Sequence, residues 1–598
     1  MFSNSLYDRH SGRNACDPVV VTKSIAQENL MKRSFAVFLI TIAILFALFP
    51  QSNAQPETYD LVIADGRIVD GSGNPWFYGD VAIRADRIAA IARKIDANAR
   101  RRIDAKGMIV APGFIDMLGQ SEISLLIDPR AESKVFQGIT TEVTGEGGSA
   151  APLNDFILKE LDPYFTHFKV TADWRTMGEY FDRLERNHSA INLASYVGAT
   201  QIRQYVLHSD NRSPTPDELD QMRKLVAQSM EGGAVGISTS LVYAPAAYAK
   251  TDELIELAKV ASRYGGVYAT HMRNESNSIM QAIDEAIRIG KEANIPVEIF
   301  HLKVAGKQNW GKMAAVIKKI EDARAQGVDI TADQYPYIAG ATSLGASVPP
   351  WAAEGGTDKF VARLKDPATR EKLKKEMRTP TTSWENFYLG ADGGKGILIS
   401  SVLNRDLAKY EGKRISEVAK MMGKPDELDA LFDLIVADNA QTGAIYFLMN
   451  EDDVKLAMKQ PWVSVGVDHG EVATTGPLAE GNAHPRGYGS FPRILGKYVR
   501  DEHVLTLEEA IRKMTSLTAN RVHLEGRGLL KTGFFADVVV FDPNEIHDVA
   551  TFENPNHNSV GMQYVMVNGQ LVVDDKSQTK NLPGRPLRRY SRETGASR

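Results

Sequence analysis

Short apolar runs rich in β-branched residues recur through the middle of the chain, and a stretch with helical periodicity follows most of them. This alternation is typical of an α/β fold with a parallel sheet. Eight parallel strands in series predict a TIM-like (β/α)8 barrel, whose reactive groups lie at the carboxyl ends of its strands. The predicted strands are 108–116, 139–144, 191–197, 234–239, 267–271, 296–301, 328–333 and 463–468, and amphipathic helices between them include 216–231, 251–264, 278–293 and 312–325.

The two flanks of this region alternate apolar and polar positions with a period of two. Residues 59–103 do so before the predicted barrel, and residues 533–542 and 560–573 do so after it, with Gly, Asp and Asn at the turns. Such runs predict strands joined by tight turns. We therefore expect a small β-sandwich domain built from residues 56–108 and 527–585, with the barrel occupying 109–526.

The interval 338–461 is long and precedes the last predicted barrel strand. It contains helical stretches of its own, such as 426–436. Long loops without secondary structure are uncommon in compact domains. The interval is therefore predicted to be an inserted cap.

The first 55 residues have the pattern of an export signal. A basic start at Met31 precedes the apolar run Ser34–Phe49, and Pro50 breaks that run. The segment Ser52-Asn53-Ala54 then places small residues at the two positions that a signal peptidase recognises. This predicts a secretory signal peptide, with its core at about 31–54, and a periplasmic or secreted protein. The run is short for a membrane span, so no stable insertion is expected after cleavage; an uncleaved N-terminal anchor is the alternative. The single cysteine, Cys16, would be lost, which excludes disulfides and thiolate ligands from the mature protein.

Composition and charge are those of an ordinary soluble protein. The chain is 43% hydrophobic and 24% charged, and its formal net charge is -5 over 598 residues. So small a charge gives no electrostatic reason to expect nucleic acid or an anionic membrane as a partner. A small-molecule substrate is the expected partner.

Three predicted barrel strands run from apolar residues into an ionisable one, namely His271, His301 and Asp468. Each alone is more often a hydrogen-bonded residue of the rim or core. In a barrel, however, all three would converge on one mouth, where unpaired polar groups are costly. Two neutral imidazoles suit a divalent transition metal, most plausibly zinc. A neighbouring carboxylate suits a base that takes a proton from water.

Several segments, in order from about Thr58 to Val573, resemble the N-acyl-D-amino-acid deacylase (D-aminoacylase) branch of the amidohydrolase superfamily. They are ADGRIVDGSGNP (64–75), APGFID (111–116), YATHMRNE (268–275), IFHLK (299–303), DQYPYIAGAT (333–342), HPRGYGSFPRILGKYVR (484–500), MTSLTANRV (514–522) and GFFADVVVFDP (533–543). The resemblance implies a barrel of the metal-dependent hydrolase type with a small β-sandwich.

Carried over by position, the resemblance implies that His271 and His301 are metal ligands and that Asp468 is the general base and later the acid. Cationic and hydroxyl groups suit the carboxylate of an acylated amino acid and its amide carbonyl. For Lys303 and Arg273 the alternative is a salt bridge at the rim of the barrel. The residues that the resemblance places around the substrate are Lys303, Tyr335, Arg273 and Tyr243.

The chain departs from its family at the first metal position. Family members follow the PGFID strand with a His-x-His pair, but here the two positions hold Leu118 and Gln120. Leucine cannot bind a metal, and a glutamine amide is a poor neutral ligand. The first metal position is therefore predicted to be absent.

The second departure concerns a thiolate ligand. The deacylases carry Gly-Asn-Cys-Gly after their second strand, whereas this chain has glycine at the cysteine position and Glu146 one residue earlier. A carboxylate is an acceptable zinc ligand, and neighbouring glycines would let it reach. Our hypothesis is that Glu146 completes a three-ligand site with His271 and His301; alternatively it bonds amides of its own turn. Glu122 is a weaker ligand candidate. One zinc ion is expected, with manganese or cobalt tolerated.

The sequence thus predicts a metal-dependent hydrolase of linear amides that converts an N-acyl-D-amino acid, or a D-configured peptide, to a carboxylate and a free D-amino acid. The same groups would serve a cyclic amidohydrolase of the dihydroorotase or hydantoinase kind. A catalytically degenerate barrel that only binds a small molecule is a third possibility, favoured by the lost ligands. The joint presence of His271, His301 and Asp468 argues against it.

Overall fold

The computed structural model describes residues 58–589. The predicted signal peptide and Cys16 lie outside this range, so export stays a prediction. Within the range, no helix combines the length and apolar character needed to cross a membrane.

A closed barrel of parallel strands forms the centre of the fold, as predicted. Its strands pair in two arcs, β17-β13-β12-β11-β10-β9 and β6-β7-β8, with β8 continued by β9 after Tyr196. The backbone N–H of Met117 donates to Val465 O (3.1 Å) and that of Asp468 donates to Leu118 O (2.7 Å), which closes the barrel between β6 and β17. The strands are β6 (Phe114–Asp116), β7 (Ile139–Thr144), β8 (Asn192–Ser195), β9 (Val197–Gly198), β10 (Gly236–Ser240), β11 (Val267–His271), β12 (Val297–Ile299), β13 (Ile330–Gln334) and β17 (Val463–Val465).

Helices follow the strands and bury one apolar face each, as helical periodicity requires. In α7 (Pro216–Glu231) the side chain of Thr215 accepts from the N–H of Glu218, whose carboxylate bonds back, and proline occupies the first turn. This reciprocal cap satisfies N–H groups that the helix start would leave unpaired. The other helices of the barrel region are α2 (Ser124–Ile127), α3 (Glu132–Val135), α4 (Asp155–Phe168), α5 (Met177–Asn187), α6 (Ala199–Leu207), α8 (Thr251–Arg263), α9 (Ile279–Ala293), α10 (Met313–Ala325), α16 (Glu451–Met458), α17 (Arg486–Arg493), α18 (Leu507–Met514) and α19 (Ser516–Arg521).

The first predicted strand, 108–116, is two strands. β5 (Ile109–Pro112) pairs with strands of the β-sandwich, whereas β6 begins the barrel. The chain changes partners at Gly113, where a Cβ would lie 2.2 Å from Oγ1 of Thr140. Only glycine fits so close to that side chain. The barrel therefore begins after Gly113, not at residue 109.

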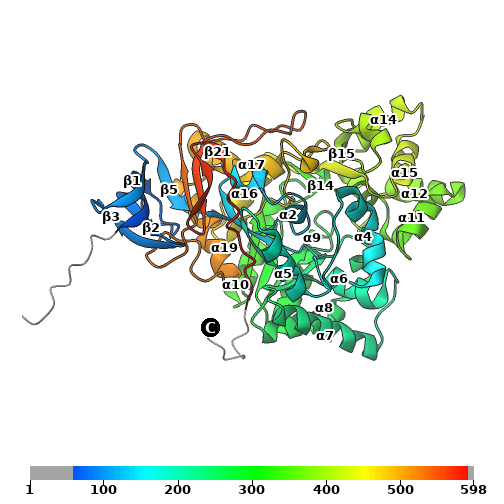
Figure 1. Cartoon of the computed structure of the whole chain (residues 1–598). Coiled ribbons are helices and arrows are strands. Elements are labelled where there is room, and N and C mark those ends of the chain that lie inside the picture. The colour runs from blue at the N-terminus through cyan, green and yellow to red at the C-terminus, as the bar shows by residue number, and fades with distance from the viewer. Residues whose placement is uncertain (1–57, 590–598) are drawn as a thin grey trace, which may run out of the picture. The chain divides into compact units, whose positions relative to one another are not determined.

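Both ends of the described chain contribute to one nine-stranded sheet, ordered β21-β20-β19-β18-β5-β1-β2-β3 with β4 beside β1. β18 lies between β5 and β19, so backbone hydrogen bonds join the two ends directly. In Figure 1 the blue strands near β5 lie beside the orange and red strands near β21. Ile63, Val81, Val540 and Met566 share its buried core. This confirms the β-sandwich built from both ends. Its strands are β1 (Tyr59–Ile68), β2 (Phe77–Arg84), β3 (Arg87–Ala92), β4 (Ala99–Asp104), β18 (Val538–Phe541), β19 (Met562–Val567), β20 (Gln570–Asp574) and β21 (Ser577–Gln578).

The interval before β17 folds as a cap with its own apolar core, which includes Leu364, Ile397 and Leu431. Its helices gather together beyond β14 and β15 in Figure 1. The cap ends before residue 461, because α16 packs against α10 and β17 as a barrel helix. Cap elements are the antiparallel strands β14 (Ala339–Ser343), β15 (Ile397–Ser401) and β16 (Gly443–Phe447), and the helices α11 (Thr357–Lys365), α12 (Pro367–Met377), α13 (Phe387–Gly390), α14 (Ile415–Met421) and α15 (Glu427–Ala437).

Candidate metal centre at the barrel mouth

A cavity of about 290 Å³ opens at the carboxyl ends of the barrel strands, between the barrel and the cap. Its position is the one where a barrel of this type gathers reactive groups. The lining residues are Gln120, Glu146, Gly148, Thr200, Ser240, Tyr243, His271, Glu275, His301, Lys303, Tyr335, Gly340, Ala341, Thr342, Phe387, Tyr446, Leu448, Asp468 and Arg486.

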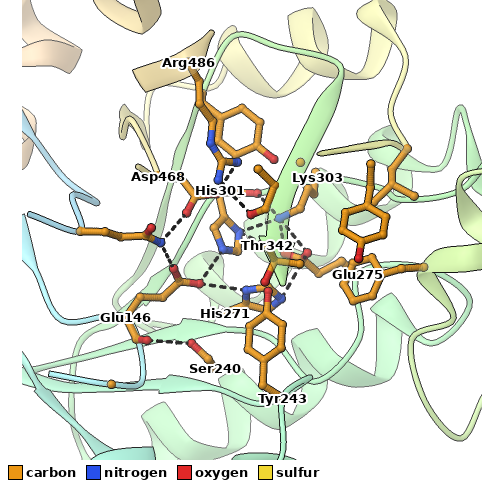
Figure 2. A pocket seen from close by; sticks show the side chains of 18 of the residues that line it. Glu146, Ser240, Tyr243, His271, Glu275, His301, Lys303, Thr342, Asp468 and Arg486 are labelled. Carbon is orange, nitrogen blue, oxygen red and sulfur yellow. Dashed lines mark hydrogen bonds and ion pairs between the residues drawn. The ribbon is translucent and has the colours of Figure 1, made fainter. Parts of the chain in front are cut away.

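Glu146, His271 and His301 converge within this cavity (Figure 2). Nδ1 of His271 lies 2.9 Å and Nε2 of His301 lies 3.0 Å from the same oxygen, Oε1 of Glu146. One ligand atom from each residue lies within 4.8 Å of the other two. The Glu146 carboxylate contacts these imidazoles and the side-chain amide of Gln120, and not the backbone amides of its own turn.

The turn after β7 directs Glu146 toward the mouth. Gly145 and Gly147 have φ angles of 97° and 69°, which L side chains rarely adopt. A Cβ on Gly147 would lie 2.5 Å from Oγ of Ser240, so this position has no room for a side chain. Ser240 also donates a 3.0 Å hydrogen bond to the carbonyl of Glu146. The compressed turn thus excludes a ligand at 147 and presents one at 146.

Glu275 lies behind both imidazoles. Its carboxylate oxygens are 3.5 Å from Nε2 of His271 and 3.2 Å from Nδ1 of His301, on the ring sides that face away from Glu146. Burial alone would raise the pKa of Glu275, but Lys303, at 2.7 Å, and the two imidazoles hold it well below the usual range. An ionised carboxylate on this side of a histidine ligand favours a ring orientation that turns the other nitrogen toward the metal position.

Asp468 occupies the opposite side of the mouth, after β17. Its Oδ2 lies 2.7 Å from Nη1 of Arg486, and its Oδ1 accepts a 3.1 Å hydrogen bond from Nε2 of Gln120. Burial raises the pKa of Asp468 above that of an ordinary aspartate, although Arg486 opposes the shift. A carboxylate whose pKa is raised is better suited to exchange protons during a reaction.

Two of these residues have a strained backbone. His301 has φ 36° and Asp468 has φ 55°, in the left-handed region that non-glycine residues seldom occupy. The N–H of His301 donates to Oδ1 of Asp333 (3.0 Å), and that of Asp468 donates to Leu118 O (2.7 Å). Strain of this kind persists where the surroundings fix it, and it concentrates at functional sites.

The three converging side chains fit a divalent cation. Two imidazole nitrogens and one carboxylate oxygen form a donor set that suits zinc and tolerates manganese or cobalt. Although burial would raise the pKa of Glu146, hydrogen bonds from His271 and His301 hold it well below the usual range. An ionised ligand is what a cation requires.

Comparison with known proteins places this site in a family. A sequence model of the amidohydrolase family matches residues 101–573. The chain belongs to the amidohydrolase family. D-aminoacylase from Alcaligenes xylosoxydans xylosoxydans is 37% identical to it over 547 residues, which are 90% of this chain and 99% of that relative.

Two solved structures extend the similarity to three dimensions. N-acyl-D-glutamate deacylase from Bordetella bronchiseptica, complexed with zinc and a phosphonate inhibitor that mimics the tetrahedral intermediate, matches with TM-score 0.74 at 33% identity, over 89% of this chain and 100% of that one. A D-aminoacylase with a binuclear metal centre matches with TM-score 0.74 at 35% identity, with the same coverage. In that protein one metal activates and the second metal attenuates. These matches confirm the resemblance to the deacylase branch.

Of the residues that the sequence placed around the substrate of this amidohydrolase, Lys303, Tyr335 and Tyr243 line the cavity, but Arg273 does not. The guanidinium of Arg273 pairs with Glu285 on α9 at 2.8 Å and donates to two carbonyls of the preceding loop. With its donors engaged there, Arg273 lies outside the lining of this cavity. Glu122 is also outside the lining, and burial raises its pKa to about 7.

Sequence inspection missed two charged residues of this amidohydrolase site, Glu275 and Arg486. Both lie within segments that carry the family resemblance, YATHMRNE and HPRGYGSF. Glu275 follows His271 by four residues, so its charge beside a candidate ligand was the available signal. Arg486 gave no comparable signal, because it meets Asp468 only through the loop that follows β17.

Proposed function

We propose that this amidohydrolase removes the acyl group from N-acyl-D-amino acids and releases a carboxylate and a free D-amino acid. The observation that carries the proposal is the convergence of Glu146, His271 and His301 beside Asp468 in one cavity. The D configuration is supported by the names of the relatives, which are D-aminoacylase and deacylases of N-acyl-D-glutamate and N-acyl-D-aspartate.

Glu146, His271 and His301 would hold one divalent cation, zinc in the first place. When bound, such an ion polarises the amide carbonyl and lowers the pKa of water. The protein's part is to hold these ligands in a fixed arrangement. Glu275 lies within ion-pair distance of both rings on the sides away from Glu146, and the compressed turn at Gly147 holds Glu146 in place.

Asp468 would carry the proton through the reaction. It accepts a proton from the attacking water as the water oxygen bonds to the acyl carbon, and it returns that proton to the nitrogen as the C–N bond breaks. Its carboxylate is held from two sides, by Gln120 and by Arg486. The chain thus supplies an oriented base that can also serve as the acid.

Tyr335 and Arg486 would bind the substrate carboxylate. Lys303 would support them from the same cavity, where its ammonium donates to Glu275 (2.7 Å) and lies 2.7 Å from Nδ1 of His301. The hydroxyl of Tyr335 is buried and has no hydrogen-bond partner among the described residues. The guanidinium of Arg486 lies 4.6 Å from the centre of the Tyr335 ring, so a cation packs against the ring that carries this unpaired hydroxyl. An unsatisfied buried donor is costly unless a ligand pairs with it.

Tyr335→Phe should raise KM for N-acetyl-D-leucine about 10-fold, because one hydrogen bond to a charged group is worth roughly 1.5 kcal/mol. The free energy of unfolding should not fall, since no protein partner is lost. Steady-state kinetics and thermal unfolding measure both quantities. Tyr337→Phe is the matched control: its hydroxyl bonds Pro485 and Asp548, so this variant should lose stability and keep the wild-type KM. An unchanged KM for Tyr335→Phe would remove Tyr335 from the substrate site.

A substrate panel tests the proposed function as a whole. With zinc, manganese or cobalt supplied, the protein should hydrolyse N-acetyl-D-amino acids and leave the L enantiomers intact, with the free amino acid measured by chiral chromatography. Turnover of dihydropyrimidine or hydantoin rings without any linear amide would instead assign a cyclic amidohydrolase. Binding of an ion with no turnover of either class would identify a degenerate barrel.

A further inference from the structure

Gln120 lies between the two halves of the candidate active site. Its Nε2 donates to Oε2 of Glu146 at 2.7 Å and to Oδ1 of Asp468 at 3.1 Å. Both amide hydrogens are used, one on each carboxylate. Because both partners only accept hydrogen bonds when ionised, the nitrogen rather than the oxygen must face them.

The two carboxylates need such a bridge. A single nitrogen reaches both, so their facing oxygens are close enough to repel each other when both are ionised. The remaining contacts of each acid point elsewhere: Glu146 meets the imidazoles through Oε1, and Asp468 meets Arg486 through Oδ2. Either a cation or N–H donors must stabilise the facing pair, and the structure supplies donors.

Position 118, the other departure from the His-x-His pair, offers no ligand to a cation. Leu118, two residues earlier, is buried in an apolar cluster inside the barrel with Ile115 and Val143. Gln120 directs its hydrogens, not a lone pair, at the space between the acids. In contrast, a solved D-aminoacylase has a binuclear metal centre in which the second metal attenuates activity.

We infer that Gln120 is a positioning residue that replaces a second cation between Glu146 and Asp468. The amide stabilises the two carboxylates without adding charge, orients Asp468, and leaves a centre that holds one ion even when metal is in excess. The inference rests on the proposed function, because it presupposes that Glu146, His271 and His301 hold that ion.

Two variants of similar size test the inference, with metal content measured in the absence of substrate. Wild-type protein incubated with excess zinc at pH 8 and passed over a desalting column should retain one ion per chain. Gln120→Glu replaces the donor with a third carboxylate of the same shape and should raise the stoichiometry to two. Gln120→Leu is slightly shorter, has neither donor nor ligand, and should remain at one.

Kinetics of Gln120→Leu then test the positioning role. Loss of an orienting hydrogen bond should lower kcat about 10- to 100-fold with little change in KM. Two ions on the wild type, or one ion on Gln120→Glu, would contradict the claim that Gln120 replaces a cation. A wild-type kcat for Gln120→Leu would contradict its positioning role. A wild-type protein that binds no ion would contradict the proposed function itself, which is a different result from two bound ions.

Discussion

Asp468→Asn should lower kcat/KM for an N-acetyl-D-amino acid by about 10²- to 10⁴-fold, the usual contribution of a positioned acid–base group. Asparagine has nearly the shape of aspartate but cannot accept the proton of the attacking water. Asp468 contributes no atom to the converging cluster, so the bound ion should remain. Single-turnover rates on zinc-loaded protein and metal analysis of the same sample measure the two effects separately.

The matched control for this variant is Glu122→Gln. Glu122 is also an acid whose pKa is raised by burial, but it lies outside the cavity lining. Its amide variant should keep near-wild-type turnover. Asp468→Asn also leaves Arg486 without its carboxylate partner in a site where that guanidinium is 2% exposed, so thermal unfolding must accompany the kinetics. Full activity in folded Asp468→Asn would show that another group carries the proton.

Glu146→Ala should lose both the ion and the activity. Removal of the single anionic ligand leaves two neutral imidazoles, and the loss of affinity should exceed the roughly 10- to 100-fold that accompanies changes to groups behind the ligands. Competition with a fluorescent zinc chelator measures the affinity, and emission spectroscopy measures the metal retained after desalting.

Glu146→Gln separates charge from shape in the same experiment. The amide keeps the side-chain length and one oxygen, but it is a weak neutral ligand. Its affinity should fall between those of wild type and Glu146→Ala. If Glu146→Ala keeps a full equivalent of zinc, the carboxylate is not a ligand and the turn after β7 has another role.

The barrel mouth was predictable because three signals were local. His271, His301 and Asp468 each end an apolar run that predicts a strand, and parallel strands of a barrel bring such residues to one mouth. Glu146 was predictable for a related reason, since glycines on both sides of it mark a tight turn at a strand end. The structure brings all four to one cavity.

Contacts that depend on how distant segments meet were not predictable. The bond between Gln120 and Asp468 spans 348 residues and exists only because the barrel closes between β6 and β17. The break at Gly113 depends on Thr140, a side chain of the next strand. Arg273 lies next to the candidate ligands in sequence, yet Glu285 on α9 pairs with it outside the cavity. In each case tertiary packing overrides the local pattern.

Anomalous diffraction at the zinc edge from crystals of the zinc-loaded protein tests the metal centre most directly. One peak is expected, about 2.0–2.2 Å from a carboxylate oxygen of Glu146, from Nδ1 of His271 and from Nε2 of His301. A peak bound by other residues, or none at the barrel mouth, would contradict this assignment of the ligands.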